Sequence, residues 1–295
     1  MINLLKKLYS SLPIIRELRR IDARLADQAS QLAAHFRLTE TTGVIQALEA
    51  LKAGNERYRD PKRLLVYGAQ YSSQNYEDGM IAEIFRRIGT ISKTFVEIGV
   101  GDGIENNTTA LLSAGWNGWW IDGDKANCGK IESWIHSRPG RDARLKICHA
   151  LVSPDNIQTY FSELGIPAEV DLFSLDIDLD TYHIWKALKN FRPRAIVVEY
   201  NAGIPPNVEW THPFEAGRIW DDTQAFGASL KSFERLGASC NYSLVGCDIT
   251  GINAFFVRDD LVGDKFMAPY TAENHYEPPR YGLLYRWGHR PRMMP

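Results

Sequence analysis

The sequence predicts an α/β protein whose mostly parallel sheet is covered by helices on both faces. Three observations lead to this prediction. Short apolar runs rich in β-branched and aromatic residues recur between residues 76 and 265, and helical patterns separate them. Most of these runs are apolar throughout, as expected of strands buried on both faces. A glycine-rich turn follows the first run, at the place where α/β sheets bind ligands.

Seven strands and six helices are expected in this region. The expected strands are residues 94–98, 118–121, 145–152, 170–177, 194–199, 242–245 and 254–257. The expected helices are residues 80–88, 106–114, 131–136, 156–164, 182–189 and 225–236. The last two strands follow each other directly, with Gly251 in the turn between them, so we expect them to close the sheet as an antiparallel pair.

Residues 1–75 are expected to form a helical extension and a connector, and residues 266–295 a tail rich in proline and aromatic residues. Six residues of the extension recur at alternating steps of three and four, the spacing of a coiled-coil seam: Leu18, Ile21, Leu25, Gln28, Leu32 and His35. The seam fits a homo-oligomer or a helix lying on its own domain. Neighbouring arginines also permit weak peripheral attachment to an anionic membrane, although acidic residues interrupt them.

Composition excludes several classes of protein. The chain has 295 residues, is 44% hydrophobic and 24% charged, and is therefore typical of a globular protein with a substantial core. A net charge of −2 gives no general phosphate-binding surface, so we do not expect nucleic acid as a partner. The four cysteines show no Cys-x-x-Cys pairing, which favours reduced thiols in a cytoplasmic protein.

The glycine-rich turn and the strand after it predict a nucleoside-containing cofactor. Gly99, Gly101 and Gly103, with Asp102 among them, would let the backbone turn sharply and approach a ligand. Asp122 ends the second strand, where its carboxylate can accept hydrogen bonds from two ribose hydroxyls.

The spacing of the turn favours one cofactor over another. A dinucleotide site prefers Gly-x-Gly-x-x-Gly, whereas this turn reads Gly-x-Gly-x-Gly and is preceded by Glu97 in the strand. A carboxylate there would repel a pyrophosphate but attract the amino group or sulfonium of S-adenosylmethionine. The pattern resembles motif I of the class I, Rossmann-like methyltransferases. In that family the positions matching His149, Ala150 and Leu151 contact the adenine.

A second cluster of acidic residues follows the fourth and fifth strands. Asp176, Asp178 and Asp180 alternate at the end of one strand, and Glu199 and Asn201 end the next. These oxygen ligands would suit Mg²⁺ or Mn²⁺, which could activate an acceptor hydroxyl. The cluster resembles that of the magnesium-dependent sugar O-methyltransferases of macrolide biosynthesis, although Glu199-Tyr-Asn201 departs from their paired aspartates. A metal-free acidic edge is the alternative.

The remaining candidates concern the acceptor. Asp176 and Asp178 are expected to handle its proton, directly or through a metal, and His183 just beyond them is a candidate general base. The polar segment 203–213 is expected to be a substrate loop. Aromatic faces and amides suit sugar rings, so the predicted acceptor contacts are Tyr200, Asn201 and Trp210.

Over residues 73–258 the chain also resembles a bacterial group related to the FkbM-type methyltransferases of surface-polysaccharide loci. The matching phrases are Ser73-Gln-Asn-Tyr-Glu-Asp-Gly79, Phe95-Val-Glu-Ile-Gly-Val-Gly-Asp-Gly-Ile-Glu-Asn-Asn-Thr108, Ser174-Leu-Asp-Ile-Asp178 and Val197-Val-Glu-Tyr-Asn201. This resemblance implies methyl transfer to an oxygen of a saccharide or another small polar acceptor.

Two other functions stay open. A nicotinamide-linked epimerase or dehydrogenase would also place Asp122 on a ribose, and Tyr182 and Lys186 have the Tyr-x-x-x-Lys spacing of such enzymes. A non-catalytic scaffold built on a methyltransferase core is the second alternative.

Overall fold

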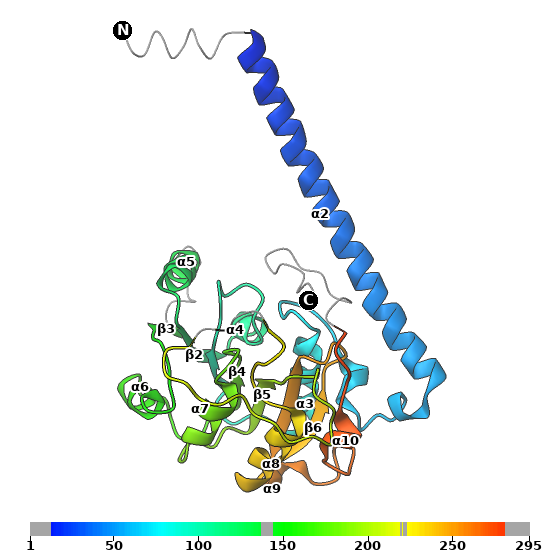
Figure 1. Cartoon of the computed structure of the whole chain (residues 1–295), viewed down its shortest axis with the longest axis vertical. Coiled ribbons are helices and arrows are strands. Elements are labelled where there is room, and N and C mark those ends of the chain that lie inside the picture. The colour runs from blue at the N-terminus through cyan, green and yellow to red at the C-terminus, as the bar shows by residue number, and fades with distance from the viewer. Residues whose placement is uncertain (1–12, 137–143, 219, 221–222, 281–295) are drawn as a thin grey trace. The chain divides into compact units, whose positions relative to one another are not determined.

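A computed structural model describes residues 13–136, 144–218, 220 and 223–280 (Figure 1). The chain divides into two units. One unit is Leu48–Tyr281 and contains the whole sheet, so it is wider at both ends than the predicted core of residues 76–265. The other comprises Met1–Ala47 and Gly282–Pro295, and its described part is helical.

The sheet has seven strands in the order β3-β2-β1-β4-β5-β7-β6. Their bounds are β1 Thr94–Ile98, β2 Asn117–Asp122, β3 Leu145–His149, β4 Leu172–Leu175, β5 Ala195–Glu199, β6 Tyr242–Cys247 and β7 Asn253–Arg258. The first five strands are parallel, and β7 runs antiparallel to both β5 and β6. This strand order, with a reversed seventh strand, is the Rossmann-like fold of class I methyltransferases, and it confirms the predicted fold class.

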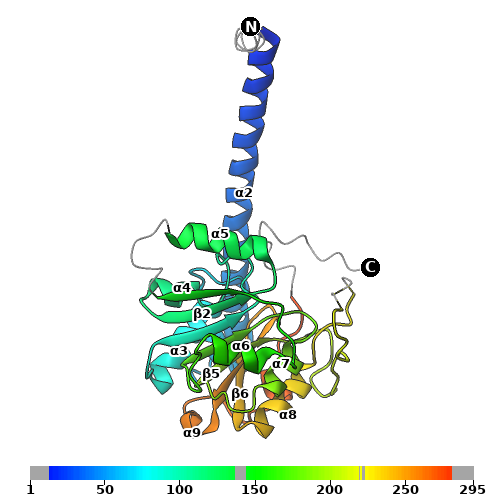
Figure 2. The same cartoon turned by 90° about the vertical axis from the view of Figure 1, so that its left-hand side faces the viewer.

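Helices cover both faces of the sheet (Figure 2). The helices are α3 Glu77–Ile88, α4 Thr109–Ser113, α5 Lys125–His136, α6 Ile157–Glu163, α7 Thr181–Ala187, α8 Leu230–Ser239, α9 Asp259–Val262 and α10 Ala272–His275, with 3-10 turns η1 Glu56–Tyr58 and η2 Leu64–Tyr67. Side chains of α6, α7 and α8 pack into one hydrophobic cluster, and those of α3, α4 and α5 pack into the other.

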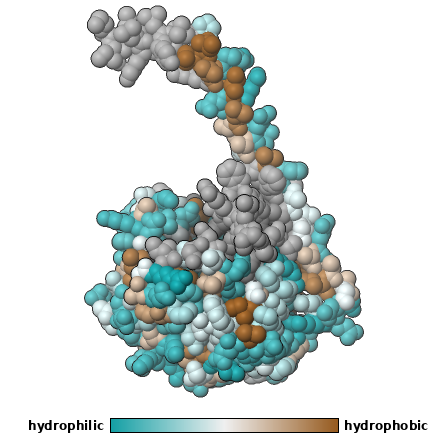
Figure 3. Space-filling model, viewed as in Figure 1, coloured by the Kyte–Doolittle hydropathy of each residue, from teal (hydrophilic) through white to brown (hydrophobic). Residues whose placement is uncertain are grey.

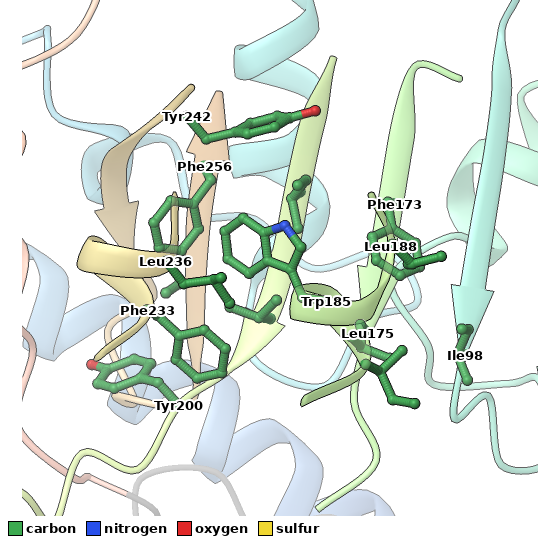
Figure 4. Close-up of a cluster of buried hydrophobic side chains, with 14 of the residues drawn as sticks. Ile98, Phe173, Leu175, Trp185, Leu188, Tyr200, Phe233, Leu236, Tyr242 and Phe256 are labelled. Atoms are coloured by element: carbon green, nitrogen blue, oxygen red, sulfur yellow. The ribbon is translucent and has the colours of Figure 1, made fainter. Parts of the chain in front are cut away.

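Alternation along the strands feeds both clusters. In β5, Ala195 and Val197 contribute to the cluster under α3–α5, whereas Ile196 and Val198 contribute to the cluster under α6–α8. The cluster under α6–α8 contains several aromatic rings that pack on one another (Figure 4). The ring centres of Trp185 and Phe256, for example, lie 5.0 Å apart. A sheet buried on both faces explains why its strands are apolar throughout.

The helix predicted at residues 225–236 begins five residues later than expected. Residues 225–229 precede α8 instead of belonging to it, and the helix starts at Leu230. Ser229 is its N-cap, because the Ser229 hydroxyl oxygen accepts a hydrogen bond from Ser232 N–H. The apolar residues Phe226 and Ala228 are buried in an irregular connection, in which Gly227 has a φ of +57°.

The long helix α2 spans Pro13–Gly54, a length of 42 residues. Proline suits its first position because the first N–H groups of a helix have no intrahelical partner. No helix in the described ranges is long and apolar enough to cross a membrane.

His275 in α10 provides a pH-dependent test of the fold. Its side chain is buried and its Nε2 donates to the carbonyl oxygen of Met267 (3.0 Å). Burial, with the nearby charge of Arg63, lowers the pKa of His275 from 6.5 to about 3. The unfolded chain therefore binds this proton more readily, so its contribution to stability is complete above pH 6.5 and declines as the pH falls toward 3.

In the parent, protonation of His275 in the unfolded chain lowers the stability by about 1.4 kcal/mol for each pH unit below the unfolded-state pKa. We expect His275→Gln, which can keep the bond to Met267, to lack this loss. Urea unfolding at several pH values between 7 and 5 measures this slope. The exposed His136→Gln is the matched control. Equal slopes for parent and His275→Gln would contradict the assignment.

Candidate functional site at the carboxyl edge of the sheet

The turn after β1 lies against the end of β4. Gly99 has a φ of +83°, and a Cβ at this position would lie 1.7 Å from the carbonyl oxygen of Asp176. No other residue fits here unless β4 moves. Gly101 has a φ of +57°, but its missing Cβ would meet no atom within 4 Å. Packing therefore requires the first glycine, and the second leaves open space beside the turn.

Asp122, the last residue of β2, holds this turn in place. Its Oδ2 accepts the Gly101 N–H (2.8 Å), and its Oδ1 accepts the Asp124 N–H (2.7 Å). A carboxylate oxygen can accept more than one hydrogen bond. Asp122 can therefore fix the turn and still accept hydrogen bonds from two ligand hydroxyls.

Asp102 and Gly103, which end the turn, lie on its solvent side and its core side, respectively. Asp102 is exposed, and its Oδ1 accepts the Ile104 N–H (3.2 Å). A Cβ on Gly103 would lie 2.9 Å from the ring of Trp120, so this glycine packs toward the core.

An exposed aliphatic side chain follows β3 beside Asp122. His149 is paired with Asp122 in the sheet, and its Nε2 donates to the carbonyl oxygen of Gly123 (3.1 Å). Ala150 is buried, whereas Leu151 is 77% exposed. A Cβ on Gly123 would lie 2.7 Å from the Leu151 side chain, which places Leu151 directly after β2 as well. Such a surface suits a flat apolar ring next to a hydroxyl-binding carboxylate.

Glu97 does not face open space. The side chain is 3% exposed, and its two oxygens accept five hydrogen bonds. Four come from the segment before α4: Asn106 Nδ2 (2.6 Å), Asn107 N (2.9 Å), Thr108 N (3.1 Å) and Thr108 Oγ1 (2.5 Å). The fifth comes from Ser174 Oγ in β4 (3.1 Å). Burial raises the pKa of this carboxyl, and the donors oppose that shift. The bonds therefore tie the segment that follows the glycine turn to β1 and β4.

Sequence reasoning treated Glu97 as a direct cofactor ligand and overlooked its partners. A signal was available, because Asn106, Asn107 and Thr108 are three consecutive polar donors at the start of the next helix. Trp120 Nε1 extends the network by donating to Thr108 Oγ1 (2.7 Å).

The acidic residues after β4 diverge. The strand ends at Leu175, so the alternation expected of Asp176 and Asp178 does not apply. Both side chains are exposed, but the Asp176 backbone lies against Gly99, whereas the Asp178 carbonyl lies 3.2 Å from a Cβ placed on Gly227. Asp178 also has a φ of +50°. Asp176 is therefore the acidic residue that adjoins the glycine turn.

The residues after β5 are mostly structural. Tyr200 is 1% exposed, belongs to the core (Figure 4), and donates its hydroxyl to the carbonyl oxygen of Glu277 (2.7 Å). Asn201 is also buried: its Nδ2 donates to the carbonyl oxygens of Gln224 (2.8 Å) and Phe226 (3.0 Å), and its Oδ1 accepts the Gly203 N–H (3.0 Å). The buried Tyr200 does not offer its face to an acceptor.

The predicted metal ligands do not form a recognisable centre. Within the described ranges, no group of three or more His, Cys, Asp or Glu side chains is arranged to hold a metal ion. Glu199 is buried at the end of β5, Asn201 is committed to backbone groups, and Asp176 and Asp178 lie against different segments. The structure therefore does not bring the predicted set together.

His183 lies at the start of α7 with one ring nitrogen engaged. Its Nε2 donates to the carbonyl oxygen of His212 (2.7 Å), so the basic nitrogen of the neutral ring is Nδ1. Trp210 is half-buried in the long segment between β5 and α8, where its backbone is bonded to Ser229.

The Tyr-x-x-x-Lys pair lies in the wrong environment for a dehydrogenase. The ring of Tyr182 packs 5.8 Å from that of Phe233, and burial raises the pKa of its hydroxyl. Lys186 Nζ lies 5.9 Å from the Tyr182 ring centre. A catalytic tyrosine of that class needs a lowered pKa, which this packing does not provide.

Apolar side chains exposed on the unit Leu48–Tyr281 concentrate in loops at this edge. Four of its large apolar residues with substantial exposure belong to such loops: Tyr71, Ile104, Leu151 and Val208. Tyr71, at 78% exposure, is held in a rigid loop before α3, because Asp78 Oδ2 accepts the N–H groups of Tyr71, Ser72 and Ser73 (2.7, 2.6 and 2.8 Å). The sequence did not single out Tyr71.

Comparison with known proteins adds similarity of fold only. No model of a protein family and no curated protein matches the chain. Similar solved structures include an S-adenosylmethionine-dependent methyltransferase from Clostridium acetobutylicum (13% identity, 60% of this chain and 89% of that chain, TM-score 0.38). Another is magnesium protoporphyrin IX methyltransferase from Synechocystis (12% identity, 72% and 99%, TM-score 0.41). Because both scores are low, the fold class rests on the strand order.

The contact between Gly99 and Asp176 gives a direct test of the site. We expect Gly99→Ala to destabilise the protein by about 3 kcal/mol or more, since its Cβ collides with backbone at a positive φ. Gly101→Ala is the control, with strain of roughly 1–2 kcal/mol and no collision. Guanidinium unfolding measures both. Equal losses for the two variants would contradict the close approach.

Proposed function

We propose that the chain is an S-adenosylmethionine-dependent O-methyltransferase that acts on a saccharide or saccharide-linked small polar acceptor. The observation that carries the proposal is the arrangement of Asp122 and Gly101. A carboxylate with spare acceptor capacity fixes a glycine turn whose outer side is open, at the carboxyl edge of a class I methyltransferase sheet.

The residues at this edge fit the cofactor. Asp122 would accept hydrogen bonds from the two ribose hydroxyls, and Gly101 would admit the ligand against its backbone. Leu151 would pack against the adenine, with His149 and Ala150 directly before it in the chain. When bound, S-adenosylmethionine supplies a methyl group already activated by its sulfonium.

On the acceptor side, Asp176 is the best-placed base. Its backbone adjoins the glycine turn and its carboxylate is exposed, so it can accept a proton from a hydroxyl aligned opposite the turn. Glu97 holds the segment after the turn through the N–H groups of Asn107 and Thr108. Holding two reactants in line supplies much of the catalysis in a displacement of this kind. In this scheme the acceptor proton passes directly to a side chain of the protein.

A saccharide acceptor is favoured by aromatic side chains in two segments that follow or precede the carboxyl ends of the strands. The segment between β5 and α8 brings Trp210 and polar backbone to the edge, and the loop before α3 presents Tyr71. Aromatic faces beside carboxylates suit sugar rings. The motif phrases that resemble polysaccharide-locus methyltransferases point to the same acceptor class. The free cysteines fit a cytoplasmic location.

The cofactor assignment is tested first by calorimetric titration with S-adenosylhomocysteine, with NAD⁺ in parallel. We expect S-adenosylhomocysteine to bind, and Asp122→Asn to weaken it about 100-fold or more, because two hydroxyls lose a charged acceptor. Asp124→Asn, a neighbouring exposed carboxylate, is the control. Binding of NAD⁺ alone, or unchanged affinity in Asp122→Asn, would reject the site.

The role of Asp176 is tested by turnover. We expect Asp176→Asn to lower kcat about 10²- to 10⁴-fold with nearly unchanged affinity for S-adenosylhomocysteine, as expected when a general base is removed. Asp178→Asn is the matched control, since asparagine tolerates a positive φ. A loss of rate in Asp178→Asn that equals the loss in Asp176→Asn would remove the distinction between the two acids.

A further inference from the structure

The exposed apolar side chains of α2 form a narrow seam. Figure 3 shows apolar residues gathered along this helix. Five exposed large apolar side chains follow one another at steps of four, three, four and seven residues: Ile14, Leu18, Ile21, Leu25 and Leu32. Gln28 occupies the position between the last two, and Ile45, 51% exposed, lies outside this pattern. Leu25, for example, is 58% exposed. A stripe confined to two positions of each heptad is the seam of a coiled coil, narrower than the face of a helix that lies on a globular core.

The order of steps assigns each seam residue to a heptad position. Leu18 and Ile21 are three apart, so Leu18 takes position a and Ile21 position d. Leu25 and Leu32 are then also at a, and Ile14 is at d. Leucine at a with isoleucine at d favours assemblies of three or four helices over two.

Two polar residues in the seam select the orientation of the helices. Gln28 and His35 both occupy position d, and both are exposed. In a parallel, in-register assembly each faces its own equivalent, so polar layers meet polar layers and apolar layers meet apolar ones. An antiparallel pairing places d against a, which sets Gln28 against Leu18, Leu25 or Leu32 in every register that overlaps the apolar seam.

The charges beside the seam favour a protein partner over a lipid surface. Residues 16–27 contain four arginines and three acidic residues. Glu17 and Arg20 form an ion pair at 3.8 Å on the same helix. A membrane-bound helix or polybasic patch needs a strong excess of positive charge.

We propose that α2 assembles with the same helix of other copies into a parallel coiled coil of three or four chains. The partner is this chain itself. Assembly through the seam of α2 is independent of the enzymatic activity.

Analytical ultracentrifugation of the full chain tests the assembly. We expect a mass of three or four chains for the parent and of one chain for Leu25→Glu. Ala23→Glu is the matched control: it adds the same charge at the outward heptad position f and keeps the parent mass. A parent that sediments as a single chain or as a dimer overturns the proposal. If that single chain also co-sediments with phosphatidylserine vesicles, α2 binds a lipid surface instead.

The orientation has its own test, which does not depend on folding of the disrupted variant. Under oxidising conditions, Leu25→Cys is expected to form disulfide-linked pairs of chains, because parallel a positions lie side by side. Ala23→Cys and the parent, with its four native cysteines, control for other disulfides. Efficient oligomerisation without cross-linking of Leu25→Cys would reject the parallel arrangement.

Discussion

The buried Glu97 carboxylate is the interaction on which the rest of the site depends. A charged group removed from water is destabilising unless it is fully hydrogen-bonded, and Glu97 accepts five hydrogen bonds. Those bonds join β1, β4 through Ser174, and the start of α4. Trp120 connects β2 to the same network through Thr108. Asp122 therefore bonds to the glycine turn itself, and Glu97 anchors the segment that follows the turn.

Much of the fold could be predicted because its signals are local. Buried parallel strands are apolar throughout, so β1, β2 and β5 were placed to within one residue at each end. Gly251, at a φ of +73°, marks the turn of the antiparallel pair. Segments whose structure depends on distant partners were harder. Residues 225–229 belong to the irregular β5–α8 connection, for which the sequence offers no periodic signal.

The positions of polar residues along the sequence indicated where the site lies, but not where each side chain points. Asp122 could be placed because it ends a strand beside a glycine turn. The directions of Asp176 and Asp178 depend on where β4 stops, and element ends are poorly specified by sequence. The burial of Tyr200 depends on residue Glu277, far along the chain, whose carbonyl accepts its hydroxyl. Long-range partners of this kind leave no trace in local spacing.

The approach of Asp176 to Gly99 has a thermodynamic consequence. The backbone of the proposed base and the backbone of the cofactor turn touch, with no side chain between them to absorb movement. An acceptor that displaces Asp176 must therefore displace the turn. By linkage, whatever factor the acceptor imposes on cofactor affinity, the cofactor imposes on acceptor affinity. The affinities of the two ligands would then be coupled through this single contact.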